Sequence, residues 1–371
     1  MEEAKTEKNL KISRKMDPKI WSKLPEDVLE HVLSFLPLKT FLSLTSTCKH
    51  FKTLIFSPSF VSKFTSSSSS QFSSFLLLSH PQFHCKSPLF DTNHNSWRNL
   101  PLPFSPTLSS ASSSTLLCIS NGHLCFSNPN LSSFIICNIL AKSSRTVKFP
   151  KWPPSYELLN FVSEPKGYNY KLFMLSSFGP SSIAFVYDSK VHLWRQFEGL
   201  NHALHHHEGV FFNGLLYFIT PEPFCVEFFH LENGKWGRLG IELPAGLVFA
   251  RLVSDGHKKL FLIGGIGYNG IARSMKLWEL NEDGNFWVEI GRIPELMIRK
   301  FVSVCYHKYE HVYSFWHQDL ICICCYNWPE ILYYKVCRRT WHWLPKCPLL
   351  PEKWSCGFRW FSFVPQLYAF A

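Results

Sequence analysis

One stretch near the start of the chain organises the rest of the sequence: Leu24-Pro25-Glu26-Asp27-Val28-Leu29-Glu30-His31-Val32-Leu33-Ser34-Phe35-Leu36-Pro37-Leu38-Lys39. Its apolar residues recur in steps of three and four, which places them on one face of a short helix. Pro25 suits the first helical position, where its missing N–H is not needed, and Pro37 ends the helix.

Two further amphipathic segments follow this helix. Their apolar stripes are Leu38, Phe41, Leu42 and Thr45 in the first, and Cys48, Phe51, Leu54 and Ile55 in the second. Three short helices in about forty residues bury too little surface to form a core of their own. The apolar face is therefore expected to pack against another protein.

The segment from residue 21 to residue 64 resembles an F-box, the module that binds a Skp-type adaptor in SCF ubiquitin ligases. The matching residues are Leu24-Pro25, Asp27-Val28-Leu29, Val32-Leu33, Leu36-Pro37-Leu38, Leu44 and Thr47-Cys48-Lys49-x-Phe51. The resemblance implies an all-α module whose adaptor-binding residues are Leu24, Pro25, Val28, Leu29, Val32, Leu33, Leu36, Pro37 and Leu38. It also implies a cullin as an indirect partner. A generic amphipathic helical hairpin is the alternative.

The 371 residues are enough for this module and one larger body. We expect a charged flexible tail at 1–20, a serine-rich linker at 65–74 and the larger body at 75–371. The thirteen cysteines are odd in number and lack framework spacing, and the charged start lacks the apolar core of a signal peptide. No apolar run approaches the length of a membrane span. A reducing setting, the cytoplasm or the nucleus, is therefore expected.

A repeat marked by tryptophan fills the larger body. Each tryptophan follows a strand-ending residue by six positions: Asp91 and Trp97, Asp188 and Trp194, His230 and Trp236, Asn281 and Trp287, Lys335 and Trp341. The first interval is about twice the others, so a sixth unit without its tryptophan is placed near 134–149. Asn-Gly pairs at 121–122 and 213–214 predict hairpins within the units.

These units predict an all-β propeller with six blades of four strands, and their pattern resembles degenerate kelch repeats. Residues 358–364 are expected to pair into the first blade and close the ring, because open sheet edges invite aggregation. The whole chain then resembles plant-type F-box proteins with a kelch or F-box-associated propeller. The fold class is thus multidomain, with an all-α module followed by an all-β propeller.

Three other motifs contain residue types found in cofactor or metal sites. The run 265–270 spells a dinucleotide-binding motif, but the following segment alternates like a strand, which favours a kelch glycine turn. Cys322 and Cys324 alternate along an apolar strand and read as small buried hydrophobes rather than zinc ligands. The histidines at 205–207 lie in a predicted loop. We expect no catalytic residue, metal or cofactor, and keep a propeller enzyme using the glycine loop or a metal as the alternative.

The net charge of +11 is scattered along the chain, which favours solvated strand edges over a nucleic-acid surface. Attraction to an acidic or phosphorylated protein is the next interpretation. A basic propeller that binds nucleic acid remains a weaker alternative, and binding to a membrane is not expected.

The leading hypothesis is a non-catalytic substrate receptor of an SCF-type ubiquitin ligase. The hairpin turns before each tryptophan are short and polar, whereas the loops expected on the opposite propeller face are longer and carry aromatic and cationic residues together. That opposite face is predicted to bind a protein substrate through an acidic or phosphorylated segment. The residues predicted to do so are Trp152, Tyr156, Tyr268, Arg273, Arg299 and Trp316.

Overall fold

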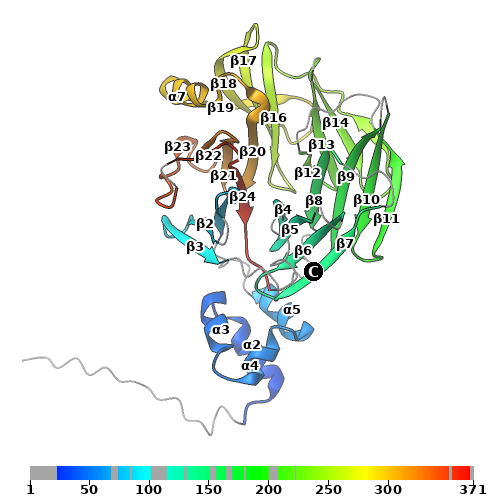
Figure 1. Cartoon of the computed structure of the whole chain (residues 1–371), viewed down its shortest axis with the longest axis vertical. Helices are drawn as coiled ribbons and strands as arrows, with labels where there is room; N and C mark the ends of the chain where they lie inside the picture. The colour runs from blue at the N-terminus through cyan, green and yellow to red at the C-terminus, as the bar shows by residue number, and fades with distance from the viewer. Residues whose placement is uncertain are drawn as a thin grey trace, which may run out of the picture. The chain divides into compact units, whose positions relative to one another are not determined.

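The computed structural model describes residues 23–67, 74–83, 86–101, 115–128, 132–150, 156–163, 169–178, 181–199, 208–221, 223–350 and 353–367. It divides into two compact units, Met1–Phe72 and Ser73–Ala371 (Figure 1). The predicted tail at 1–20 lies outside the described residues. No helix in the described ranges is long and apolar enough to cross a membrane.

The described residues of the first unit form four helices: α2 (Glu26–Ser34), α3 (Leu38–Leu44), α4 (Lys49–Leu54) and α5 (Pro58–Ser67). Pro25 and Pro37 directly precede α2 and α3, so Pro37 both stops the first helix and starts the second. The Cys48 thiol accepts a hydrogen bond from the Phe51 N–H at 3.4 Å and caps α4. The sequence predicted these three helices but not α5.

Helix α5 gives the first unit a core. Its side chains Phe60, Val61 and Phe64 are buried, and the Phe60 ring centroid lies 4.7 Å from that of Phe41 on α3. The expectation that the short helices cannot form a core of their own was wrong, because it did not include this helix. The serine-rich segment predicted as a linker from residue 65 also begins inside α5.

The second unit is a propeller of six four-stranded antiparallel blades, as predicted. From inner to outer strand, blade 1 contains β24 (Arg359–Phe363), β1 (Phe75–Ser79), β2 (Lys86–Asp91) and β3 (Ser96–Pro101); blade 2 contains β4 (Leu116–Ser120), β5 (His123–Asn128), β6 (Ser133–Asn138) and β7 (Ser143–Lys148); blade 3 contains β8 (Leu158–Ser163), β9 (Tyr170–Phe178), β10 (Ser181–Asp188) and β11 (Leu193–Glu198).

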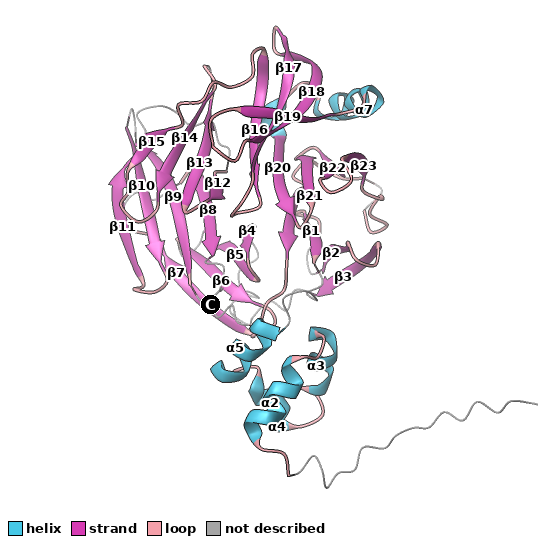
Figure 2. Ribbon diagram, turned by 180° about the vertical axis from the view of Figure 1, so that it is seen from behind, coloured by secondary structure: helices cyan, strands magenta, loops and turns pink. Residues whose placement is uncertain are grey.

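The other three blades follow the same order. Blade 4 contains β12 (Val210–Phe212), β13 (Leu215–Thr220), β14 (Cys225–His230) and β15 (Trp236–Arg238); blade 5 contains β16 (Leu247–Ser254), β17 (Leu260–Tyr268), β18 (Ile271–Leu280) and β19 (Trp287–Arg292); blade 6 contains β20 (Val312–His317), β21 (Leu320–Cys325), β22 (Trp328–Lys335) and β23 (Thr340–Trp343). Helix α7 (Glu295–Cys305) and the 3₁₀ turn η2 (Tyr309–His311) connect blades 5 and 6, and α7 contacts β18 and β22 (Figure 2).

The last strand closes the ring. Strand β24 pairs antiparallel with β1, so that Phe363 lies opposite Phe75 and Arg359 lies opposite Ser79. Strand β24, the last strand of the propeller, thus forms the inner strand of the blade that begins with β1, the first strand of the propeller. The pairing covers one open edge of each of these two strands. The predicted closure by residues 358–364 is confirmed.

The tryptophan repeat marks the outer strands. Each repeated tryptophan lies on the fourth strand of its blade, and 134–149 contributes β6 and β7 of the blade that lacks one. In blades 1, 3, 4 and 5 the side chain of the residue six positions earlier caps the turn before that strand; for example, the Asp91 carboxylate accepts hydrogen bonds from the N–H groups of Asn93 and His94. Asn138 accepts similarly from Leu140 and Ala141. The repeat therefore consists of a residue that caps the turn and a tryptophan that packs on the blade.

Most glycines near 265–270 lie within a strand, where they leave room for neighbouring side chains, and do not form the turn. Gly264, Gly265 and Gly267 lie inside β17, and a Cβ added to Gly265 would lie 2.4 Å from the Phe249 ring. The turn itself is Asn269-Gly270, where both residues have positive φ. The predicted glycine turn is thus shorter than expected. A strand, β18, follows it, whereas a dinucleotide site requires a helix.

Candidate protein-binding faces

Helix α2 has one buried face and one exposed apolar face. Val28, Val32 and Phe35 are 40%, 41% and 60% exposed, which is unusual for residues of this kind. Among the other predicted adaptor contacts, Pro25 and Pro37 are exposed, and Leu24, Leu29 and Leu36 are half-buried. The side chain of Leu38 lies outside the described residues. We call Val28, Val32, Phe35, Pro25 and Pro37 the apolar face.

Leu33 does not share this face. It is 5% exposed and belongs to the core of the helical unit, so the structure differs here from the predicted set of adaptor contacts. Position 33 lies with Glu30 and Ser34, which are also buried. The helical period alone groups all the apolar residues on one stripe. Only the position of α5 divides them into a covered and an open part.

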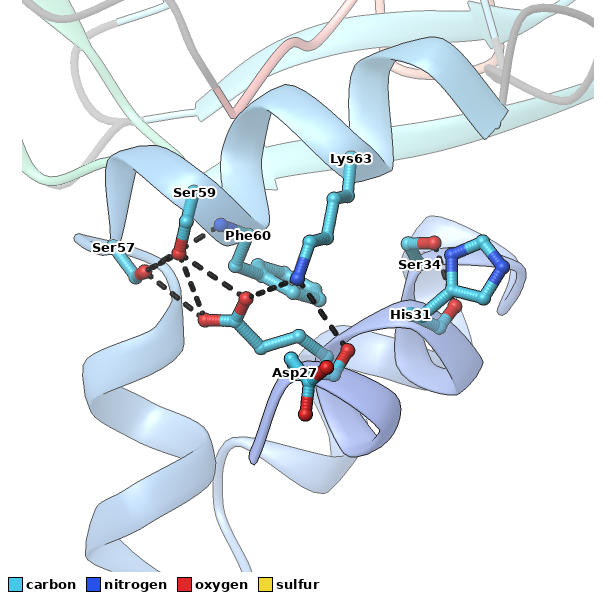
Figure 3. Close-up of polar contacts among 8 residues, drawn as sticks. Asp27, His31, Ser34, Ser57, Ser59, Phe60 and Lys63 are labelled. Atoms are coloured by element: carbon cyan, nitrogen blue, oxygen red, sulfur yellow. Dashed lines mark hydrogen bonds and ion pairs between the residues drawn. The ribbon is translucent and has the colours of Figure 1, made fainter. Parts of the chain in front are cut away.

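A buried carboxylate holds α2 against α5 (Figure 3). Glu30 accepts hydrogen bonds from the hydroxyls of Ser57 and Ser59 at 3.2 Å and 3.0 Å, and from the Lys63 ammonium at 2.8 Å. Burial by itself raises the pKa of Glu30, but Lys63 and the two serines together bring it below its ordinary value of 4.5. The ion pair fixes which side of α2 is covered and leaves the apolar face open.

The propeller has two faces of different character. Connections between the second and third strands of a blade, and from each outer strand to the next blade, lie on one face, which we call the loop face. It carries the turn 269–270 and the connection 293–311. The other, the turn face, carries short turns such as 213–214 and 281–286. Length does not separate the two faces: the loop-face turn 269–270 has two residues, whereas the turn-face connection 281–286 has six.

Three of the predicted substrate-binding residues lie close to blade 5. Tyr268 ends β17 and is 62% exposed, and the Arg273 guanidinium stacks on its ring at 5.3 Å from the centroid. Arg299 lies on α7, exposed, and pairs with Glu295 at 2.5 Å. Arginine and tyrosine in such exposed positions are typical of binding surfaces.

The other three predicted residues have different surroundings. Tyr156 is half-buried against Phe134 and Phe149, and burial raises its pKa to about 12. Trp316 does not lie in a loop: it is part of the inner strand β20 and stacks on Phe261, with centroids 5.7 Å apart. Trp152 lies outside the described residues, as do the histidines at 205–207.

A pocket of about 410 Å³ lies between blades 4 and 5 and the connection after α7; Gly270, in the turn between Tyr268 and Arg273, forms part of its wall. Its wall combines apolar side chains with a few polar ones: Pro221, Phe224, Phe249, His307, Tyr309 and Glu310. His307 Nδ1 lies 2.8 Å from the Tyr309 hydroxyl. None of these residues is in the predicted substrate-binding set, because they come together only when the ring forms.

The cysteine-rich strand β21 is structural. Cys322, Cys324 and Cys325 are fully buried, and burial raises the pKa of all three thiols, to about 11 for Cys325. Protonated buried thiols act as small hydrophobes, in agreement with the sequence interpretation. Within the described residues, no group of three or more histidine, cysteine, aspartate or glutamate residues is placed to hold a metal ion.

Residues 21–63 match the F-box domain family. Together with the fold, this match defines the class: an F-box protein with a six-bladed propeller. An F-box/kelch-repeat protein of Arabidopsis thaliana is 53% identical over 368 residues, which cover 95% of this chain and 89% of that protein. The chain therefore belongs to the F-box/kelch-repeat family.

Two further relatives are more distant. Protein UNUSUAL FLORAL ORGANS of Arabidopsis thaliana is 23% identical over 365 residues, covering 90% of this chain and 80% of that protein. A second F-box/kelch-repeat protein of the same plant is 24% identical over 387 residues, covering 93% and 89%. Both alignments extend through the propeller as well as the F-box.

Proposed function

We propose that this protein is the substrate-receptor subunit of an SCF-type ubiquitin ligase. Its apolar face binds a Skp-type adaptor, and through the adaptor a cullin, while the propeller holds a protein substrate. The observation that carries this proposal is an F-box whose α2 helix leaves Val28, Val32 and Phe35 uncovered. The protein supplies no chemistry of its own: it raises the effective concentration of a substrate lysine near the conjugating enzyme. We expect this to occur in the cytoplasm or the nucleus.

The loop face of blade 5 is the proposed substrate site. Arg273 has no carboxylate within 4 Å among the described residues, and its charge lies over the exposed Tyr268 ring beside the 410 Å³ pocket. A cation, an aromatic face and an apolar pocket together suit a segment with an acidic or phosphorylated residue followed by an apolar one. Arg299 is less suited to this role, because Glu295 already neutralises it.

The test compares the proteins that co-purify with three forms of the full chain, measured by quantitative mass spectrometry. The variant R273E/Y268A should lose substrate by about tenfold or more while it retains the adaptor, because a hot-spot pair contributes over 1.4 kcal/mol. The variant D283K on the turn face is the matched control and should keep both. Retention of every co-purifying protein by R273E/Y268A would place the substrate elsewhere.

A further inference from the structure

A cavity of about 250 Å³ lies on the propeller axis and shares Ile219 and Arg251 with the wall of the blade 5 pocket. All six blades or their connections contribute to its wall: Arg359 from blade 1, Ile119 from blade 2, Asn160 from blade 3, Glu208 leading into blade 4, Arg251 from blade 5 and Tyr313 from blade 6. Phe161, Phe315 and Trp360 add apolar surface. The cavity is large enough for a small ligand or the tip of a longer one.

An ion pair crosses this cavity. Arg359 begins the inner strand of blade 1, and Glu208 lies two residues before the inner strand of blade 4, three places away in a ring of six. Arg359 Nη2 nevertheless lies 2.5 Å from Glu208 Oε1. In the described part of the chain this is the single hydrogen bond of the Arg359 side chain, whose guanidinium also lies over the Phe361 ring, 5.3 Å from its centroid. A guanidinium has five N–H groups, so most of its donors are unused.

The main chain beside Glu208 is fixed. The Asn160 amide donates to the Gly209 carbonyl at 2.6 Å and accepts from the Gly209 N–H at 3.0 Å. Glu208 has 51% of its side-chain surface open, and it forms part of the cavity wall. Desolvation raises the pKa of Glu208, although Arg359 acts against this rise. The Gly209 backbone is held by Asn160 and not by the ion pair with Arg359.

The cavity wall carries an excess of positive charge. Its charged residues are Arg251, Arg359 and Glu208, which is two cations and one anion, a net charge of +1. Arg251 donates to the carbonyls of Ala250, Val312 and Tyr309, which hold the guanidinium but do not neutralise it. Burial lowers the pKa of Arg251 to about 9, so it remains charged at neutral pH. One carboxylate from a ligand would bring the net charge of the side chains that line the cavity to zero.

We propose that the axial cavity is a binding site for a ligand with one carboxylate, which takes the unused N–H groups of Arg359 in competition with Glu208. Arginine binds carboxylates through two parallel hydrogen bonds, and the apolar wall suits a short aliphatic or aromatic remainder. The carboxylate can come from a small organic acid or from an acidic side chain at the tip of a protein segment. The inference does not depend on adaptor binding or on a substrate contact at Tyr268 and Arg273.

Isothermal titration of the full chain at constant ionic strength tests this site. The probes are sodium propionate, the blocked peptide Ala-Ala-Glu-Ala-Ala and the same peptide with glutamine in place of glutamate. We expect E208Q to bind a carboxylate probe about tenfold more tightly than the wild type, because a like charge is removed, and R359Q to bind it at least about tenfold more weakly. R338Q, a change at an exposed arginine in the connection between β22 and β23, away from both the cavity and the blade 5 pocket, is the matched control and should change nothing.

The two carboxylate probes separate the sources. Binding of propionate assigns the site to free organic acids, and binding of the glutamate peptide but not its glutamine counterpart assigns it to acidic side chains. Because R359Q removes the Glu208 partner and can affect folding, the gain with E208Q is decisive, and unchanged thermal unfolding of E208Q is its control. Equal affinity of wild type and E208Q, or no heat above a sodium chloride blank with either probe, would overturn the proposal.

Discussion

His317 lies at the seam where the ring closes. Its side chain is fully buried on β20, with Nδ1 2.9 Å from the Ser362 hydroxyl on β24 and Nε2 3.4 Å from the Thr92 hydroxyl of blade 1. Burial lowers its pKa to about 4 from 6.5, so the imidazole is neutral at pH 7. Two hydroxyls, which can donate or accept, suit a neutral ring without a carboxylate nearby.

This histidine gives a pH prediction with a definite sign. Its folded pKa is depressed, so the unfolded chain binds the extra proton first and stability falls as pH drops from 6.5 towards 4. Between pH 7 and pH 5 the loss from this group is about 2 kcal/mol. Urea unfolding at the two pH values should show a loss smaller by this amount in H317N than in the wild type. An equal loss in both would show that His317 is not responsible.

Among the secondary-structure elements, helix α5 could not be predicted from the sequence. Its residues Phe60, Val61 and Phe64 have helical spacing, but β-branched, aromatic and serine residues are weak helix formers, and a serine tract follows directly. Tertiary packing on Phe41 overrides this low propensity. The first three helices were predictable because proline, acidic and apolar positions agreed. The division of α2 into buried Leu33 and exposed Val28 was not, since it depends on α5.

The propeller strands were predictable because their signals are local. Asn213-Gly214 adopts φ of 50° and 85°, as the two-residue hairpin requires, and Trp236 lies on the outer strand of the same blade. The axial pair of Glu208 and Arg359 was not predictable. The two residues are 151 positions apart and meet only when the ring closes, so no spacing in the sequence connects them.

Two tryptophans join neighbouring blades. Trp194 Nε1 donates to the Lys148 carbonyl on β7 at 2.8 Å, and Trp236 Nε1 donates to the Glu198 carbonyl on β11 at 2.9 Å. In each case an outer strand is tied to the outer strand of the preceding blade. Trp194 and Trp236 therefore link neighbouring blades as well as stabilising their own hairpins, whereas the buried Nε1 atoms of Trp97 and Trp287 have no such partner in the described residues.

Replacing Trp236 with phenylalanine should remove this inter-blade bond and lower the free energy of unfolding by about 1–2 kcal/mol. Trp341 has no such bond in the described part of the chain, so W341F is the matched control, with a smaller expected effect. Urea titration of the two variants measures the difference. Equal destabilisation would mean that indole packing alone matters.

At the scale of the molecule, closure by β24 should be essential. Ending the chain after Ser355 removes Trp360, Phe361 and Phe363 from the core, and large aromatic truncations cost about 3–5 kcal/mol each. Their sum is comparable with the whole stability of a domain. The truncated chain should therefore lose its protease-resistant propeller, and a synthetic peptide of residues 353–371 added in trans should restore part of it. A truncated chain with native melting behaviour would contradict closure.

We propose that the apolar face of the helical unit connects this protein to a ubiquitin ligase. Calorimetry of the full chain with a purified Skp-type adaptor measures that contact. We expect one adaptor bound per chain, loss of binding in V28D/V32D by at least about a hundredfold with the circular dichroism spectrum unchanged, and normal binding in D283K. Wild-type affinity in a folded V28D/V32D variant would contradict it.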